Sequence, residues 1–212
     1  MKDIDNFFES EYKFILDHRY YKPNRDYVAD TNRFLKIIEV FESLESKEGK
    51  HYWLLGHAYY SLQRKEYRKG VIVNLEKYLQ LGDYFEDDYK NNKIIIDFDH
   101  NIIKDPKTKN EMVLAKKIHL QMVYYLLAKT YQVENLIENA YIHILKGIEV
   151  YPENKILFFW ELYEVLRKRN DLQEFLDRCE NLSKIEKEKV SILIIRAKDL
   201  IDRGYVFKPR KK

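Results

Sequence analysis

One stretch of the chain, residues 121–154, spaces small and bulky residues as two tightly packed helices require. Ala128, Ala140 and Gly147 are small, and large apolar residues fill positions between them. Small residues let two antiparallel helices approach closely, while large ones fill the remaining space. Pro152 stops the second helix, because proline cannot continue one. The stretch therefore predicts a helix–turn–helix unit.

This unit resembles a tetratricopeptide repeat (TPR), a helix pair of about 34 residues. Counted from Gln121, the residues at the family's signature places are Tyr124, Leu127, Ala128, Tyr131, Ala140, Ile144, Gly147 and Pro152. We also expect Asn135 and Glu138 to form a capping box that opens the second helix. The resemblance implies a right-handed superhelix of stacked helix pairs.

Two further segments, residues 49–82 and 156–186, resemble the repeat less completely. The first keeps the first-helix pattern, and its second helix fits only if the turn around Gln63 to Glu66 carries extra residues. The second has Tyr163 where a small residue is usual. We therefore expect the second pair to be splayed or rotated relative to its neighbours.

The capping box of Ser183 and Glu186, followed by Gly204, predicts a C-terminal capping helix over residues 186–203. The chain has only six Gly and four Pro in 212 residues, too few turn residues for a many-stranded sandwich or barrel. We therefore expect an all-α, TPR-like solenoid as a single domain over residues 1–204. Its predicted helix pairs cover about residues 3–46, 49–82, 111–154 and 156–186.

Residues 83–110 do not follow the repeat and are predicted to be an insertion. Ile94, Ile96 and Phe98 alternate with Ile95, Asp97 and Asp99, which indicates a short strand or hairpin. Insertions in such repeats often lie on the binding face. We expect this one to fold over the groove.

The composition indicates a protein of a reducing compartment, and we expect it to be cytoplasmic. No run of about 18 apolar residues is present, which predicts no membrane insertion. The N-terminal residues lack the apolar core of a signal peptide. The single cysteine, Cys179, occupies a predicted core place, so we expect an inert buried thiol.

The formal net charge of +3 comes from the basic tail, residues 205–212. That tail holds Lys208, Arg210, Lys211 and Lys212, so the rest of the chain is close to neutral. Aromatic residues without an adjoining basic stripe do not make a nucleic-acid surface. We therefore expect no nucleic-acid partner and interpret the tail as a solubilising disordered end.

The TPR resemblance implies a binding groove lined by the first helix of each pair. The residues at the family's contact places are Trp53, His57, Tyr60, Tyr125, Lys129, Gln132, Trp160, Glu164 and Arg167. Exposed aromatic residues flanked by charges of both signs suit a protein or peptide partner, because aromatic side chains dominate binding hot spots. The alternative is that these rings pack between helices or under the insertion.

The family's carboxylate clamp, which grips an acidic C-terminus with Lys and Asn, is not reproduced. Trp53 and His57 occupy the places of those residues. An adaptor for chaperone tails is therefore not expected, although Lys129 and Arg167 still suit an acidic partner.

No motif for catalysis, a metal or a cofactor is present. Asp97, Asp99 and Asn101 open with the spacing of a calcium loop, but Ile102 replaces its turn glycine and Thr108 its bidentate glutamate. The phosphate-binding, nucleophile-elbow and zinc-protease motifs are also missing from the sequence. We predict no catalytic residues, no metal ligands and no cofactor.

The sequence therefore predicts a noncatalytic scaffold or adaptor that binds a peptide or protein segment in its groove. Three alternatives remain open. The first is a peptide-sensing regulator that sequesters a protein partner. The second is an enzyme that uses the carboxylates of the insertion together with His100. The third is a homo-oligomer that assembles through uncapped ends or through the groove.

Overall fold

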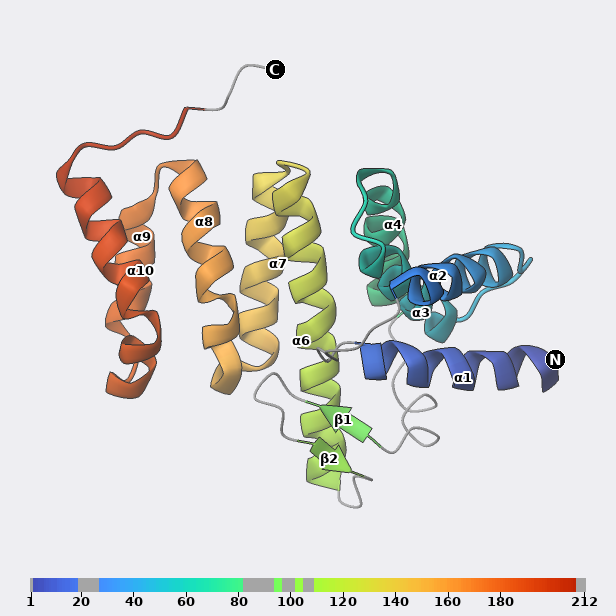
Figure 1. Cartoon of the computed structure of the whole chain (residues 1–212). Coiled ribbons are helices and arrows are strands. Elements are labelled where there is room, and N and C mark those ends of the chain that lie inside the picture. Colours follow the sequence, from blue (N-terminus) through green and yellow to red (C-terminus); the bar gives the residue numbers. More distant parts are fainter. Residues whose placement is uncertain (1, 19–26, 82–93, 97–101, 105–108, 209–212) are drawn as a thin grey trace. The chain divides into compact units, whose positions relative to one another are not determined.

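A computed structural model describes residues 2–18, 27–81, 94–96, 102–104 and 109–208 (Figure 1). These residues are mainly helical, which confirms the expected all-α class. The exception is a short antiparallel hairpin of β1 (Ile94–Ile96) and β2 (Ile102–Lys104), in which Ile95 lies opposite Ile103. Both strands fall within the predicted insertion, where a strand or hairpin was expected.

The chain forms two compact units, Met1–Asn92 and Lys93–Lys212. That residues 1–204 form one continuous domain stays a prediction.

The N-terminal unit contains four α-helices and one short 3-10 helix among its described residues. They are α1 (Lys2–His18), α2 (Tyr27–Glu42), α3 (Gly49–Ser61), η1 (Lys65–Tyr67) and α4 (Arg68–Leu81). The irregular turn expected around Gln63 to Glu66 overlaps η1, and Gln63 has a left-handed backbone with φ of 51°. The α3–α4 pair matches the predicted pair 49–82.

The core of the N-terminal unit is aromatic. Phe34, Phe41 and Tyr78 are fully buried. The ring of Tyr12 in α1 lies 4.9 Å from that of Trp53 in α3, so α1 covers one side of α3. The guanidinium of Arg33 in α2 donates to both carboxylate oxygens of Glu11 in α1, at 2.7 and 2.9 Å, and joins these two helices.

The C-terminal unit contains five α-helices and a 3-10 segment among its described residues. They are α6 (Lys109–Val133), α7 (Ile137–Val150), η2 (Pro152–Phe158), α8 (Phe159–Arg169), α9 (Leu172–Glu180) and α10 (Lys184–Asp202). They lie side by side, joined by short turns (Figure 1). Pro152 lies two residues after Val150, the last residue of α7, as the sequence predicts.

The close approach of α7 to its neighbours depends on Gly147. A Cβ atom there would lie 2.2 Å from the ring of Phe158, whose side chain is fully buried. Gln121 in α6 is also buried and donates to the backbone oxygens of Gly147 and Tyr151 at 3.2 and 3.1 Å. Asn154 donates to the Gln121 side-chain oxygen at 2.8 Å. These bonds join α6, α7 and η2.

Of the two predicted capping boxes, the one at the start of α7 is absent and the one at the start of α10 is present. Asn135 does not open α7. Its backbone has a left-handed φ of 61° and closes α6 instead. The amide of the next residue, Leu136, donates to the Tyr131 backbone oxygen at 2.8 Å. No side chain caps the N-terminus of α7. The capping box of Ser183 and Glu186 is present at the start of α10.

The helices of the C-terminal unit alternate between two layers. Lys129 of α6 pairs with Glu161 of α8 at 3.0 Å, and α8 in turn contacts α10. Tyr141 of α7 donates a short hydrogen bond to Glu174 of α9. The first helix of each predicted pair therefore lies next to the first helix of the following one, and α7 lies next to α9.

Candidate partner-binding face

Two of the nine predicted contact residues do not face solvent. Trp53 is 1% exposed and His57 is 3% exposed. Their rings lie 4.2 Å apart, and Tyr12 of α1 packs against Trp53. The prediction that these two side chains line an open groove is therefore wrong, because α1 covers this part of α3. Tyr60, also in α3, is partly exposed.

The other six predicted residues lie on α6 and α8 of the C-terminal unit, and all are at least partly exposed. We call them the α6–α8 face, and they are Tyr125, Lys129, Gln132, Trp160, Glu164 and Arg167. Each set of three follows a spacing of four and three residues, which places it on one side of its helix. Three polar contacts, Lys129 with Glu161, Tyr125 with Glu161 and Lys168 with the Gln132 backbone, link the two helices along this face.

The α6 side of the face is held by a buried carboxylate. The Glu161 side chain is 5% exposed and lies 3.0 Å from the Lys129 ammonium. The Tyr125 hydroxyl donates to the same carboxylate oxygen at 3.5 Å, and the ammonium lies 5.6 Å from the centre of the Tyr125 ring. A buried carboxylate is costly when it has no partner, because it has lost its contacts with water. Glu161 therefore holds the Lys129 and Tyr125 side chains of α6 in place.

The α8 side combines an exposed indole with an ion pair. Trp160 is 49% exposed. Glu164 lies one helical turn further along and accepts a hydrogen bond from Arg167, in the turn after that, at 2.7 Å. The Lys168 ammonium reaches the backbone oxygen of Gln132 in α6 at 3.5 Å and closes the far end of the face. The face therefore offers one strongly exposed apolar group, Trp160, and the less exposed Tyr125 among charges that are already paired.

The C-terminal residues contact α8, which corrects the expectation of a disordered end for residues 205–208. Arg167 donates to the Tyr205 hydroxyl at 3.0 Å, and its guanidinium lies 5.5 Å from the centre of the Phe207 ring. The Phe207 amide donates to the Asn170 side chain at 2.5 Å. Gly204, with φ of 62°, makes the turn that returns the chain toward α8. Residues 209–212 lie outside the described residues.

Sequence reasoning missed Glu161, the buried carboxylate beneath this face. Its signal was a charge within an apolar row, because Phe158, directly before α8, and Val165 in α8 stand three residues before it and four residues after it. A carboxylate in such a row needs a cationic partner. The contact of Tyr205 with Arg167 had no comparable signal, because no helical spacing relates a tail to a distant helix.

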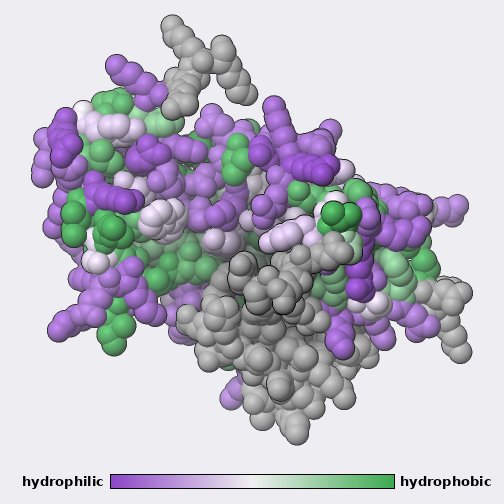
Figure 2. Space-filling model, in the orientation of Figure 1, coloured by the Kyte–Doolittle hydropathy of each residue, from purple (hydrophilic) through white to green (hydrophobic). Residues whose placement is uncertain are grey.

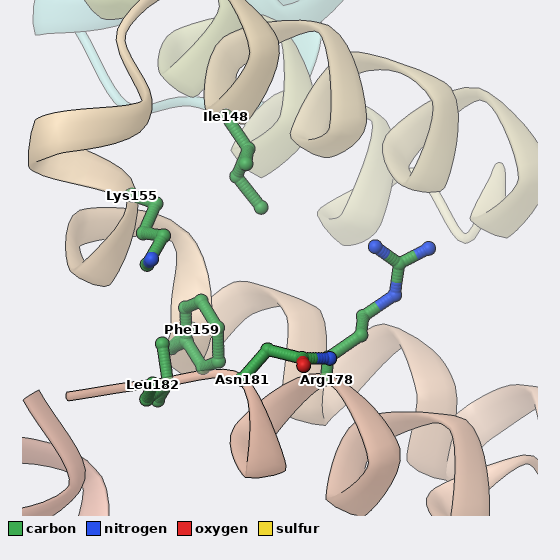
Figure 3. A pocket seen from close by; sticks show the side chains of 6 residues that line it. All are labelled: Ile148, Lys155, Phe159, Arg178, Asn181 and Leu182. Atoms are coloured by element: carbon green, nitrogen blue, oxygen red, sulfur yellow. The ribbon is translucent and has the colours of Figure 1, made fainter.

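A small hollow of about 170 Å³ between α7, η2 and α9 is a second candidate site. Figure 3 shows its lining residues, with the Arg178 guanidinium directed away from Phe159 and Leu182. Arg178 is bound to Glu174 at 2.8 Å, and Lys155 lies 3.4 Å from Glu186. Ligand pockets usually exceed about 300 Å³, and both cations here already have partners.

The polar groups beside this hollow join three helices. Arg178 donates to the Tyr141 hydroxyl at 3.2 Å, and the Arg169 guanidinium lies 4.1 Å from the centre of the Tyr141 ring. Partial burial alone would raise the pKa of Glu174, but hydrogen bonds from Tyr141 and Arg178 hold it below its ordinary value. This cluster stabilises the contacts of α9 with α7 and α8.

Cys179 is buried, and burial raises the pKa of its thiol to about 11. The thiol is therefore protonated near neutral pH and is a poor nucleophile, as the sequence predicts. The predicted carboxylate cluster of the insertion, with Asp97, Asp99 and His100, lies outside the described residues. Among the helices that the structure does describe, none has the length and apolar character needed to cross a membrane.

No protein-family model matches the chain, and no curated protein or solved structure is similar enough to count as a match.

Proposed function

We propose that the protein is a noncatalytic, TPR-like adaptor that binds a peptide or protein segment on the α6–α8 face. The TPR-like nature of the fold is part of this proposal. It is supported by the burial of the small residues Ala128 in α6 and Ala140 and Gly147 in α7, and by the close approach of Gly147 to Phe158 in η2. The alternation of the helices of the C-terminal unit between two layers agrees with it.

The observation that carries the proposal is the exposure of Trp160 on a face whose charged side chains are held in place by ion pairs. An indole buries a large area at a low cost in side-chain entropy, and tryptophan is enriched in binding hot spots. At 49% exposure, Trp160 has about half of its surface still available to a partner. A partner residue that covers it would gain most of the apolar contact on this face.

The paired charges around Trp160 reduce the cost of binding. Lys129 is held by Glu161, and Arg167 is held by Glu164 and Tyr205. Side chains that are already fixed lose little further freedom when a partner docks. We infer that they orient the partner, while Trp160 and Tyr125 supply the apolar contact. The expected ligand is an amphipathic segment with one apolar anchor and charges of both signs.

Affinity capture from the source cell tests this proposal with a matched control. Trp160→Ala removes the anchor, whereas Ile142→Ala removes a 47% exposed apolar side chain from α7, in the other layer. We expect the native chain and the Ile142 variant to retain the same partner and the Trp160 variant to lose it. Loss of a hot-spot tryptophan typically weakens binding at least about thirtyfold.

Circular dichroism of all three proteins shows whether each is folded. If the Trp160 variant is folded and still captures the partner as the native chain does, the partner binds elsewhere and the proposal fails.

A further inference from the structure

The outer side of α10 carries a stripe of six exposed residues with an unusual symmetry. The spacing between successive members is four, three, four, three and four residues, which keeps them on one side of the helix. All six are exposed, and they are Lys184, Glu188, Ser191, Ile195, Lys198 and Asp202. We call them the α10 stripe. In Figure 2 the region of α10, at the left, shows apolar side chains among hydrophilic ones.

The order of the charges in the α10 stripe places opposite charges together when the stripe of a second copy lies against it in the antiparallel direction. Lys184 and Asp202 stand at its two ends, and Glu188 and Lys198 stand one step inside them. Against an antiparallel second copy, Lys184 meets Asp202 and Glu188 meets Lys198. Two-fold symmetry forms each contact twice. The four-three spacing is also the one that antiparallel helices need to align these pairs.

The middle of the α10 stripe is complementary in shape. Ile195 is 67% exposed, and its opposite position in an antiparallel pair is the small Ser191. Beside Ser191 lies an open hollow of about 510 Å³, lined in part by Ile194 and Lys187. A protruding isoleucine fits a hole next to a small residue, as in the knobs-into-holes packing of coiled helices. Ile192, also exposed, adds apolar area beside this contact.

We propose that the α10 stripe is a self-association surface, on which a second copy of this chain docks antiparallel across a two-fold axis. A single helix pair buries less than the roughly 1,600 Å² of a typical stable interface, so the expected dimer has micromolar affinity. This surface is separate from the α6–α8 face, so the two proposals stand or fall independently.

Charge reversal tests the pairing directly in the full-length chain. Lys184→Asp and Asp202→Lys each place like charges opposite one another at both ends of the helix pair. Each reversal is expected to raise the dimer dissociation constant about tenfold, as measured by sedimentation velocity between about 10 and 500 μM protein. The double variant, Lys184→Asp with Asp202→Lys, restores opposite charges and is expected to dimerise like the native chain.

Mixing the two single variants gives a second test. A chain with Lys184→Asp is complementary to a chain with Asp202→Lys at both ends, so an equimolar mixture dimerises where each variant alone is weakened. Lys189→Asp, on the same helix but off the α10 stripe, is the matched control and leaves the dissociation constant unchanged. Helical circular dichroism establishes that each variant is folded.

Three results would overturn this proposal. One is a native chain that stays monomeric up to about 500 μM. Another is a dimer that the single reversals do not weaken. The third is a failure of both the double variant and the mixture to recover association, which would mean that another surface, or an unlike partner, meets these charges.

Discussion

The two tryptophans of the chain occupy opposite environments, although both stand at the same place of the predicted repeat. Trp53 lies under α1, whereas Trp160 is 49% exposed on α8. The spacing within α3 and α8 is alike, so it could predict which side of the helix each ring is on. It could not show what covers that side, because α1 lacks the repeat pattern.

Collisional quenching of intrinsic fluorescence reports this difference. With Trp160→Phe, only Trp53 emits, and we expect emission at short wavelength with little quenching by iodide. With Trp53→Phe, only Trp160 emits, and we expect red-shifted emission that iodide quenches strongly, because the indole is open to water. Equal quenching of the two variants would contradict the burial described above.

His51 gives the N-terminal unit a predictable dependence on pH. It is buried between Phe8 and Phe41, and burial lowers its pKa below the ordinary value of 6.5, with the nearby Lys50 acting in the same direction. Glu48 and Asp5 oppose this shift in part. Below pH 6.5 the unfolded chain therefore binds a proton at His51 that the folded chain resists, and stability falls as the pH drops.

Urea unfolding followed by the fluorescence of Trp53, in the Trp160→Phe background, measures this effect. The free energy of unfolding is expected to decrease between about pH 7.5 and pH 5.5, and His51→Gln is expected to flatten that decrease. A native chain whose stability does not change over this range would contradict the assignment.

At the scale of the element, helix positions were predictable and some helix ends were not. The α7–η2 boundary at Pro152 and the box of Ser183 and Glu186 follow from residues with a narrow range of roles. Asn135 suits two roles, because asparagine is favoured both as an N-cap and in the left-handed conformation that ends a helix. Local sequence does not decide between them, and here the residue closes α6.

Replacing Gly147 tests the close packing of α6, α7 and η2. Gly147→Ala would improve helix propensity by about 1 kcal/mol, but the added Cβ collides with the buried Phe158 ring, and overpacking costs about 1–3 kcal/mol. We expect a net loss of stability in thermal unfolding, followed by the fluorescence of Trp160 in the Trp53→Phe background.

Gly204→Ala is the matched control for this substitution. No atom lies within 4 Å of a Cβ at Gly204, so that variant meets only backbone strain at φ of 62°, worth about 1–2 kcal/mol, at the end of α10. Unchanged or increased stability of Gly147→Ala would show that α7 and η2 are less tightly packed than the structure indicates.

At the scale of the whole molecule, the sequence predicted the succession of helix pairs but only part of the candidate site. The residues of α6 and α8 were found because one helical period places them together. Glu161 and Tyr205 were missed because their partners, Lys129 and Arg167, belong to other elements. Tertiary contacts thus decided which predicted residues are available to a partner.

Site-specific photo-crosslinking tests the proposed binding face most directly. A photoreactive phenylalanine derivative at position 160 would lie on the α6–α8 face, and the same group at position 142 would lie on α7, in the other layer. With the captured partner present, we expect a crosslinked complex from position 160 and none from position 142. A partner that crosslinks at position 142 and not at position 160 would contradict the assignment of the binding face.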